Sequence, residues 1–232
     1  MAFTIEPIGT VISPYKEKFA VPRQPRLVPA ATATIELSGS ANCAEAIKGI
    51  EQFTHLWIVF LFDQNIDAGW KPTVRPPRLG GNERMGVLAT RSTFRPNSIG
   101  MSAVELKSVE QRGAQTLIHL GSVDLVDGTP IIDIKPYIPY SDSIPHAQGG
   151  YASEEPELID VQFTPGADSF LSQNKDGDHK RQVISQVLAQ DPRPAYRKGK
   201  ADHKEYGVKL YDWNVKFKIM DESVLVTTIE PL

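Results

Sequence analysis

The sequence predicts a mainly β protein, with an N-terminal β-barrel at residues 1–145 and a small α+β domain at residues 158–232. Three observations lead to this prediction. Short apolar segments recur in the first part with turn residues between them, the long helical pattern falls in the second part, and an acidic stretch containing Gly and Pro separates the two, at residues 141–157. Short strands at such spacing, with few helices, are typical of a barrel or sandwich.

The expected barrel strands follow one another at short intervals. Residues 55–62 are a nearly continuous apolar run, which is typical of a buried central strand. Residues 43–50 have the pattern of a short helix that ends near Gly49, whereas residues 15–29 and 65–82, which contain several prolines, are expected to be loops. The other expected strands are residues 3–12, 33–37, 86–90, 102–109, 116–121 and 130–137.

The second part combines one helix with antiparallel strands. Residues 178–190 place Val183, Ile184, Val187 and Leu188 on one apolar face, and Pro192 and Pro194 end the helix. In the middle strand apolar residues alternate with Asn214, Lys216 and Lys218, which predicts one packed face and one basic, solvated face. The expected strands are residues 206–211, 213–219 and 224–229.

Composition limits the class of protein. The 232 residues are 41% hydrophobic and 23% charged, which is typical of a soluble globular protein. The chain starts without an apolar segment and has no long uncharged apolar run, so we expect neither a signal peptide nor a membrane span. A single cysteine, Cys43, and the absence of a Cys/His cluster with zinc spacing fit the reducing cytoplasm and a protein without a metal.

Charge is unevenly distributed along the chain, although the formal net charge is only −3. Residues 71–95 contain six basic residues and one acidic residue, and residues 193–218 contain eight basic and three acidic residues. Residues 136–174 contain six carboxylates and no Lys or Arg. This segregation favours a basic face for phosphates, although ordinary solvated loops would explain it as well.

Two short runs carry most of the functional signal. In residues 91–100, Pro96 fixes its backbone and Asn97 tolerates a left-handed conformation, so Arg91 and Arg95 are expected on either side of a stiff bend.

The second run, residues 124–137, begins with an Asp127–Gly128 turn that leads into a strand. Alternation on that strand places Ile132 and Ile134 on one face. The other face receives the side chains of Asp133, Lys135 and Tyr137. A carboxylate, an amine and a phenol on one face are suited to catalysis. Alternatively, Asp133 and Lys135 form an ion pair with a purely structural role.

Together with residues 13–25, 55–57, 69–82 and 188–199, these runs closely resemble the tRNA N6-threonylcarbamoyladenosine methyltransferase family, the TsaA-like or TrmO proteins. The likeness extends through nearly the whole chain. It departs at Ser98, where the family usually has proline, and we expect Ser98 to follow the same turn with a looser backbone.

The resemblance implies an S-adenosylmethionine-dependent enzyme that methylates N6 of threonylcarbamoyladenosine at position 37, next to the anticodon of threonine tRNA. It also implies a barrel that forms a homodimer. The residues themselves show neither a Rossmann-type glycine turn nor a P-loop, so the cofactor assignment comes from the resemblance. Two alternatives stay open: a non-catalytic β-barrel that binds RNA or a small ligand, and a methyltransferase with another substrate.

The cofactor offers a carboxylate, an ammonium, ribose hydroxyls and an adenine edge. An Arg can hold the carboxylate in a bidentate pair, amides and carboxylates can bind the hydroxyls, and Gly lets the backbone approach the base. The positions that the family uses for the cofactor match Pro22, Arg23, Gln24, Asp63, Gln64, Arg91, Met101, Leu125, Val126, Asp127 and Gly128.

The substrate nitrogen is of the ureido type, with a delocalised lone pair, so the reaction needs a base or a hydrogen-bond acceptor. We expect Asp133 or Tyr137 to fill this role, with Lys135 lowering a partner's pKa or binding the threonine carboxylate. His119 and Trp57 are expected to be structural. Residues expected to contact RNA are Arg95, Arg193, Tyr196, Arg197 and Lys198.

Overall fold

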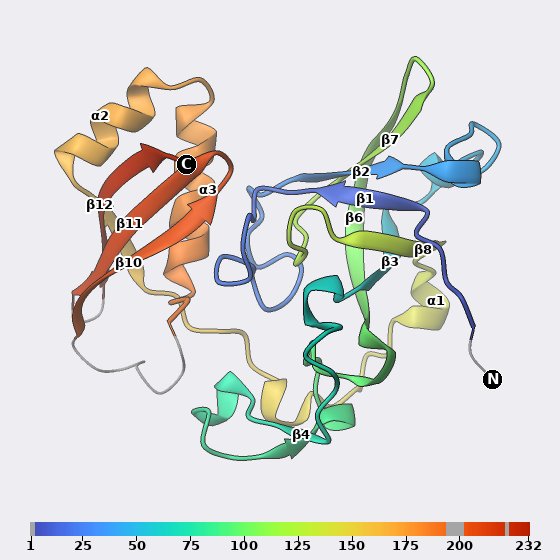
Figure 1. The fold of residues 1–232 in the computed structure, drawn as a ribbon, viewed down its shortest axis with the longest axis horizontal. Coiled ribbons are helices and arrows are strands. Elements are labelled where there is room, and N and C mark those ends of the chain that lie inside the picture. The colour runs from blue at the N-terminus through green and yellow to red at the C-terminus, as the bar shows by residue number, and fades with distance from the viewer. Residues whose placement is uncertain (1–2, 194–201, 221–222) are drawn as a thin grey trace.

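A computed structural model describes residues 3–193, 202–220 and 223–232, and shows a six-stranded barrel beside a four-stranded sheet (Figure 1). The barrel strands pair in the closed order β1-β2-β7-β6-β3-β8, and the second sheet has the order β10-β11-β12-β9. The predicted mainly β fold, a barrel followed by a small α+β part, is confirmed. No helix in the described ranges is long and apolar enough to cross a membrane.

All neighbouring strands of the barrel are antiparallel. Alternate residues of each strand face the interior, so that Leu56, Ile58 and Phe60 are buried. The barrel closes where β1 meets β8, a contact of only two residue pairs. The strands are β1 (Gly9–Ile12), β2 (Ala33–Leu37), β3 (His55–Leu61), β6 (Ile99–Arg112), β7 (Gln115–Leu120) and β8 (Pro130–Pro136).

Four local expectations for the barrel need correction. The strand expected at residues 3–12 is shorter, because only its last four residues form β1. The helix expected at residues 43–50 is wrong, because this segment is a series of turns between the 3-10 helices η1 (Gly39–Ala41) and η2 (Ile50–Gln52). Left-handed backbone at Gly39 (φ 57°) and Gly49 (φ 86°) interrupts any regular helix there.

The strand expected at residues 86–90 is short. It consists of β5 (Met85–Gly86), paired with β4 (Thr73–Val74), and continues as the 3-10 helix η5 (Val87–Ala89). In contrast, β6 is longer than predicted and forms with β7 a hairpin that projects beyond the barrel (Figure 1).

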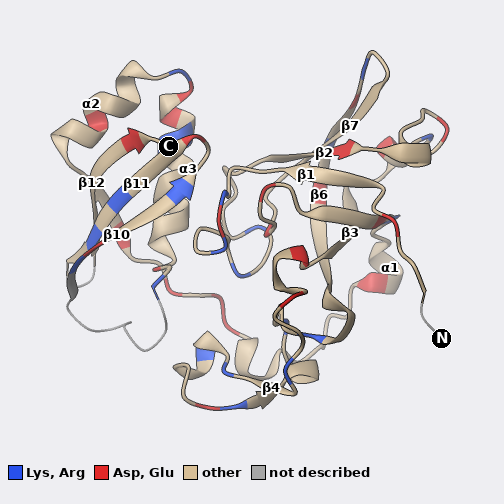
Figure 2. Ribbon diagram, in the orientation of Figure 1, with Lys and Arg blue, Asp and Glu red and all other residues tan. Residues whose placement is uncertain are grey.

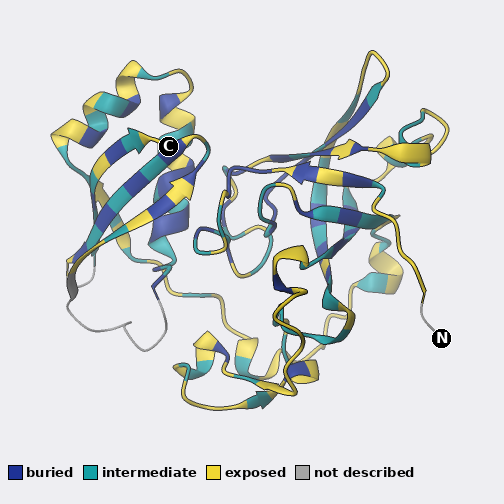
Figure 3. Cartoon of the chain, in the orientation of Figure 1, coloured by how far each residue is buried: buried dark blue, intermediate teal, exposed yellow. Residues whose placement is uncertain are grey.

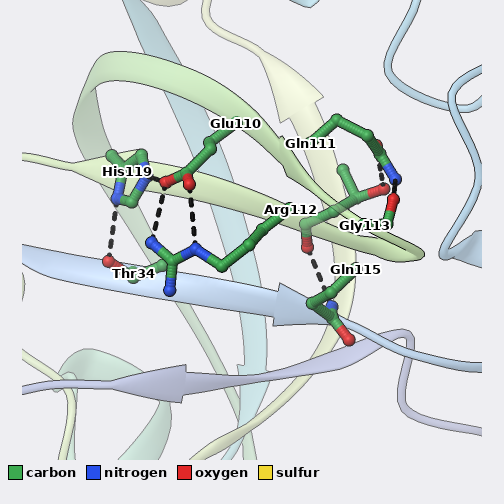
Figure 4. A network of polar contacts seen from close by, with 8 residues as sticks. Thr34, Glu110, Gln111, Arg112, Gly113, Gln115 and His119 are labelled. Carbon is green, nitrogen blue, oxygen red and sulfur yellow. Dashed lines mark hydrogen bonds and ion pairs between the residues drawn. The ribbon is translucent and has the colours of Figure 1, made fainter.

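A polar network ties this hairpin to β2 (Figure 4). The His119 ring contacts Thr34 Oγ1 through Nδ1 and Glu110 Oε2 through Nε2, both at 3.0 Å. Arg112 Nε donates to Glu110 Oε1 at 2.9 Å. The hydrogen bonds from Arg112 and then His119 lower the pKa of Glu110. His119 therefore joins strands, as the sequence predicts.

In the second part, β9 (Asp160–Phe163) pairs in parallel with β12 (Ser223–Pro231), while β10 (Asp202–Leu210), β11 (Trp213–Met220) and β12 are antiparallel. Helices α2 (Pro165–Gln173) and α3 (Gly177–Ala189) pack on one face of the sheet (Figure 3). The helix predicted at residues 178–190 is confirmed with its buried apolar face. Helix α2 and strand β9 were not predicted.

The other face of this sheet is less basic than expected. Lys216 forms an ion pair with Glu230 at 2.8 Å, and Lys218 lies 4.0 Å from Glu205. Acidic side chains on neighbouring strands thus neutralise part of the charge that alternation along β11 predicted (Figure 2).

A seam of backbone contacts joins the barrel to this sheet. Tyr15 is fully buried and bridges to Leu210, the Tyr211 N–H donates to the Pro14 carbonyl at 2.7 Å, and the Ala30 N–H donates to Gln186 Oε1 at 2.8 Å. The loop after β1 therefore contacts both parts of the molecule.

The acidic connection between the two parts also packs against the chain. It includes α1 (Pro139–Asp142) and η7 (Gly150–Ala152), and runs past the loop that carries β4 (Figure 1). Arg78 donates to the Glu154 carbonyl, and the Tyr151 hydroxyl donates to the Ala89 carbonyl at 3.4 Å. The acidic segment and one basic segment identified in the sequence are thus neighbours.

Candidate cofactor site

A cleft of about 1290 Å³ opens at the barrel, where several distant segments converge. Its walls come from residues 18–24, 57–65, 74–78, 88–102, 124–129 and 149–152. The cations that line it outnumber the carboxylates. They are Lys18, Arg23, Arg75, Arg78, Arg91 and Arg95, against Asp63 and Asp124.

Most of the predicted cofactor positions meet in this cleft. Those that line it are Pro22, Arg23, Gln24, Asp63, Gln64, Arg91, Met101, Leu125 and Val126. An Arg91 guanidinium nitrogen donates to Gln24 Oε1, which joins two of the predicted segments across 67 positions of sequence. These side chains can therefore act on one ligand together.

The other two predicted cofactor positions, Asp127 and Gly128, are not among the described residues that line this cleft. The Asp127 carboxylate accepts the Ser13 N–H at 2.9 Å and pairs with Lys16 at 2.7 Å. Gly128 has φ 78°, and its N–H donates to the Val11 carbonyl at 2.8 Å. In the described protein the two residues fix the Leu125–Val126 backbone against the start of the chain.

The bend after Arg95 has an unusual backbone. Asn97 is left-handed (φ 62°), as predicted, but Ser98 is left-handed as well (φ 50°). The expectation that Ser98 follows the turn of a proline is therefore wrong, because proline is fixed near −65°. The Ser98 carbonyl accepts the Phe62 N–H at 2.7 Å and so ties the bend to the end of β3.

Glycine is required just beyond the bend. A Cβ on Gly100 would lie 2.4 Å from the Phe60 ring, which lines the cleft. Only glycine lets β6 approach β3 this closely at its first residues.

Asp124 is a cleft residue that the sequence did not single out. It lies in the loop before β8, and its Oδ1 accepts the Ser102 hydroxyl at 2.6 Å. Burial raises the pKa of the Asp124 carboxyl to about 6, although the Ser102 hydrogen bond and the charge of Arg91 oppose the shift. The available signal was that Asp124 opens the run of residues 124–137, three positions after the last residue of a strand-like segment.

The predicted catalytic side chains lie on the outer face of β8, beyond the residues that line the cleft. Asp133 pairs across the sheet with Val59, and Val59 pairs with Met101. Paired residues share a face, so Asp133 and Met101 lie on the same side of the sheet with one strand between them. Lys135 pairs in the same way with Trp57, which also lines the cleft.

Within this group, Lys135 Nζ lies 2.6 Å from Asp133 Oδ2, and the Tyr137 ring lies 5.6 Å from the Trp57 ring. A β-bulge at Ile132 separates Ile131 from Asp133 in the register with β3, so the simple alternation expected for Ile132 and Ile134 does not hold across it. Beyond the bulge, Ile134 packs against the core and its polar neighbours face outward.

The residues expected to contact RNA fall into three positions. Arg95 lines the cleft and donates to the Thr90 carbonyl at 3.2 Å. Arg193 is 2% exposed and binds Asp191 through two of its nitrogens, at 2.8 and 2.9 Å, a placement that opposes phosphate contact. Tyr196, Arg197 and Lys198 lie outside the described residues.

A six-stranded antiparallel barrel with an arginine-lined cleft, and a small α+β part at its side, defines a class of barrel proteins that bind a small polar ligand outside any Rossmann fold. The family models identify the class more closely. The model described as the tRNA-methyltransferase O N-terminal domain matches residues 10–143, and the TrmO C-terminal domain matches residues 156–232. The chain belongs to the TrmO family.

Individual relatives agree with this assignment. The chain is 52% identical to the tRNA (adenine(37)-N6)-methyltransferase of Escherichia coli strain K12 over 99% of both proteins. It is 42% identical to the protein of the same name from Eikenella corrodens, over 76% of this chain and 97% of that one. A crystal structure of TrmO from Pseudomonas aeruginosa superposes with a TM-score of 0.80 at 36% identity, covering 99% of each chain.

Proposed function

We propose that this protein is an S-adenosylmethionine-dependent tRNA methyltransferase. Its target is N6 of threonylcarbamoyladenosine at position 37, next to the anticodon of threonine tRNA. The observation that carries the proposal is the 52% identity with the E. coli enzyme over 99% of the chain. A further relative, 45% identical over 93% of the chain, is grouped by its name with the S-adenosylmethionine-dependent methyltransferases.

The cleft fits the cofactor in chemistry and size. Drug-sized ligands occupy pockets of roughly 300–1000 Å³, and the cleft of about 1290 Å³ leaves room for part of a second substrate. Arg91 or Arg23 holds the carboxylate, Gln24, Asp63 and Gln64 bind hydroxyl or amine groups, and the backbone at Leu125 and Val126 meets the adenine edge. When bound, the cofactor supplies an electrophilic methyl group.

The outer face of β3 and β8 is suited to the nucleoside. Trp57 and Tyr137 offer ring faces for a base, and Lys135 offers a cation for the threonine carboxylate. During transfer N6 gains the methyl group and loses its proton, while the electrons of the broken carbon–sulfur bond stay on sulfur. Asp133 or Tyr137 accepts that proton in our proposal. The position one strand beyond Met101 and Trp57 supports it, because both of those residues line the cleft.

The remaining parts of the proposal concern partners and setting. Arg75 and Arg95 line the basic cleft and are proposed to contact the anticodon stem-loop, together with the segment of Tyr196, Arg197 and Lys198. We further propose two domains, residues 1–145 and 158–232, and a cytoplasmic homodimer. Exposed apolar side chains at Met101, Tyr140 and Ile144 support association, which light scattering will measure.

The experiment uses the purified protein, labelled cofactor and tRNA from cells that lack this methylation. Label should enter threonine tRNA that carries the threonylcarbamoyl group, and should not enter the same tRNA without it. Equal labelling of both would indicate a methyltransferase with another substrate. Cofactor binding by calorimetry without any transfer would indicate a non-catalytic binding protein.

A further inference from the structure

Asp124 is a half-buried carboxylate in the cleft without a cation of its own. Among the described residues no Lys, Arg or His lies within ion-pair distance of it, and the side chain that hydrogen-bonds to it is that of Ser102. The other carboxylate of the cleft, Asp63, is exposed. Removing an ionised carboxylate from water costs free energy unless a positive partner compensates it. We therefore expect Asp124 to bind a cationic group of a ligand, because the protein itself does not provide one.

The groups around Asp124 indicate which kind of ligand could bring a cation to it. The Ser102 hydroxyl donates a hydrogen bond to it, and Arg91 acts on it through its charge. The buried Tyr15 hydroxyl has no hydrogen-bond partner in the described structure, and the charge of Asp124 contributes to raising its pKa. Arg91 is bonded to Gln24 and forms no ion pair with Asp124. A positive and a negative side chain thus line one cleft near each other without neutralising each other.

An α-amino acid matches that arrangement, because its carboxylate and ammonium are two bonds apart and demand opposite partners. On the basis of the proposed function, we infer that Asp124 binds the α-ammonium group at the methionine end of the cofactor while Arg91 holds the α-carboxylate. Asp124 does not face the sulfonium. A carboxylate beside the sulfonium would stabilise a charge that disperses in the transition state, and would slow the transfer.

Three ligands separate these roles. S-Adenosylmethionine has both cations, S-adenosylhomocysteine keeps the ammonium without the sulfonium, and 5′-methylthioadenosine has neither. By calorimetry, Asp124→Asn should weaken the first two alike, by about 10- to 100-fold, the range for a lost charge-assisted hydrogen bond. Its affinity for 5′-methylthioadenosine should be unchanged, which also shows that the variant is folded.

Other outcomes overturn the inference. Unchanged affinity for all three ligands removes Asp124 from the site, a loss for S-adenosylmethionine alone assigns it to the sulfonium, and an equal loss for all three assigns it to pocket shape. The matched control, Asp160→Asn on β9, changes an exposed carboxylate of the other sheet and should leave every affinity unchanged. If the wild-type protein binds none of the ligands, the proposed function fails as well.

A second test needs no variant. The pKa of Asp124 is raised to about 6 in the free protein, and the ammonium requires the ionised carboxylate. Wild-type affinity for S-adenosylhomocysteine should therefore fall as pH drops below about 6, whereas that for 5′-methylthioadenosine should stay level. Level affinity for both between pH 5 and 7 contradicts the inference.

Discussion

The ionised form of Asp124, which we expect to bind the cofactor, lowers the stability of the ligand-free protein. Burial raises the pKa of its carboxyl from 3.8 to about 6 in the folded protein. The folded state then holds the proton more tightly than the unfolded state, so stability decreases as pH rises from about 4 to about 6, and the loss persists at pH 7. A shift of this size corresponds to about 3 kcal/mol.

Asp124→Asn should therefore raise the free energy of unfolding of the ligand-free protein at pH 7 by up to about 3 kcal/mol. At pH 3.5 nearly all of the gain should vanish, since the wild-type carboxyl is then mostly protonated in both states. Urea titrations at the two pH values measure the difference. A variant that is less stable than wild type at pH 7 would show that the carboxylate is well compensated within the protein.

The individual residues also show where sequence reasoning reaches its limit. Arg91, Gln24 and Leu125 were placed at the cofactor by resemblance, and the structure brings them to one cleft. Asp124 was missed because its burial and its contacts with Ser102 and Arg91 arise only when segments distant in sequence come together. For Arg193, a basic run predicted phosphate contact, but its pairing with Asp191 depends on how the chain folds after α3.

Among the elements, the bend of residues 95–98 gives a direct test of backbone conformation. Ser98 has φ 50°, and its N–H donates to the Arg95 carbonyl at 3.2 Å. Ser98→Pro would require another φ and would remove this donor, so we expect a loss of about 2 kcal/mol or more in the free energy of unfolding. Thermal unfolding measures it, with Ser98→Gly as the matched variant that should be stabilising.

If Ser98→Pro is as stable as wild type, the bend follows the path of the relatives that have proline here. Local signals of this kind were sufficient for Asn97, for α3, for the apolar run that forms β3 and for the apolar alternation of β11. They were insufficient for the bulge at Ile132 and the length of β6, because both are set by pairing with strands from other parts of the sequence.

At the scale of the whole molecule, the cleft carries more positive than negative side chains, although the net charge of the chain is −3. Arg75 is exposed in this cleft and forms no side-chain hydrogen bond or ion pair with any other described residue. Arg75→Ala should raise KM for tRNA and reduce the slope of log KM against log salt by about 1, as expected for one lost phosphate contact.

Arg112→Ala is the matched control, because this arginine lies on the projecting hairpin and pairs with Glu110. Its KM and salt dependence should equal those of the wild type. An Arg75 variant with unchanged salt dependence would place the RNA elsewhere. Both basic segments are evident in the sequence, but only the fold shows that the acidic connection packs beside one of them.

The short closure of the barrel has a consequence for amide exchange. Strands β1 and β8 share two residue pairs, and the Val11 carbonyl next to them accepts the Gly128 N–H. Separating β1 from β8 therefore also releases the turn that supports Leu125 and Val126. We expect deuterium to enter residues 8–12 and 127–131 together, and bound S-adenosylmethionine to slow both segments by the same factor. Slowing of residues 127–131 alone would mean that the two segments open independently.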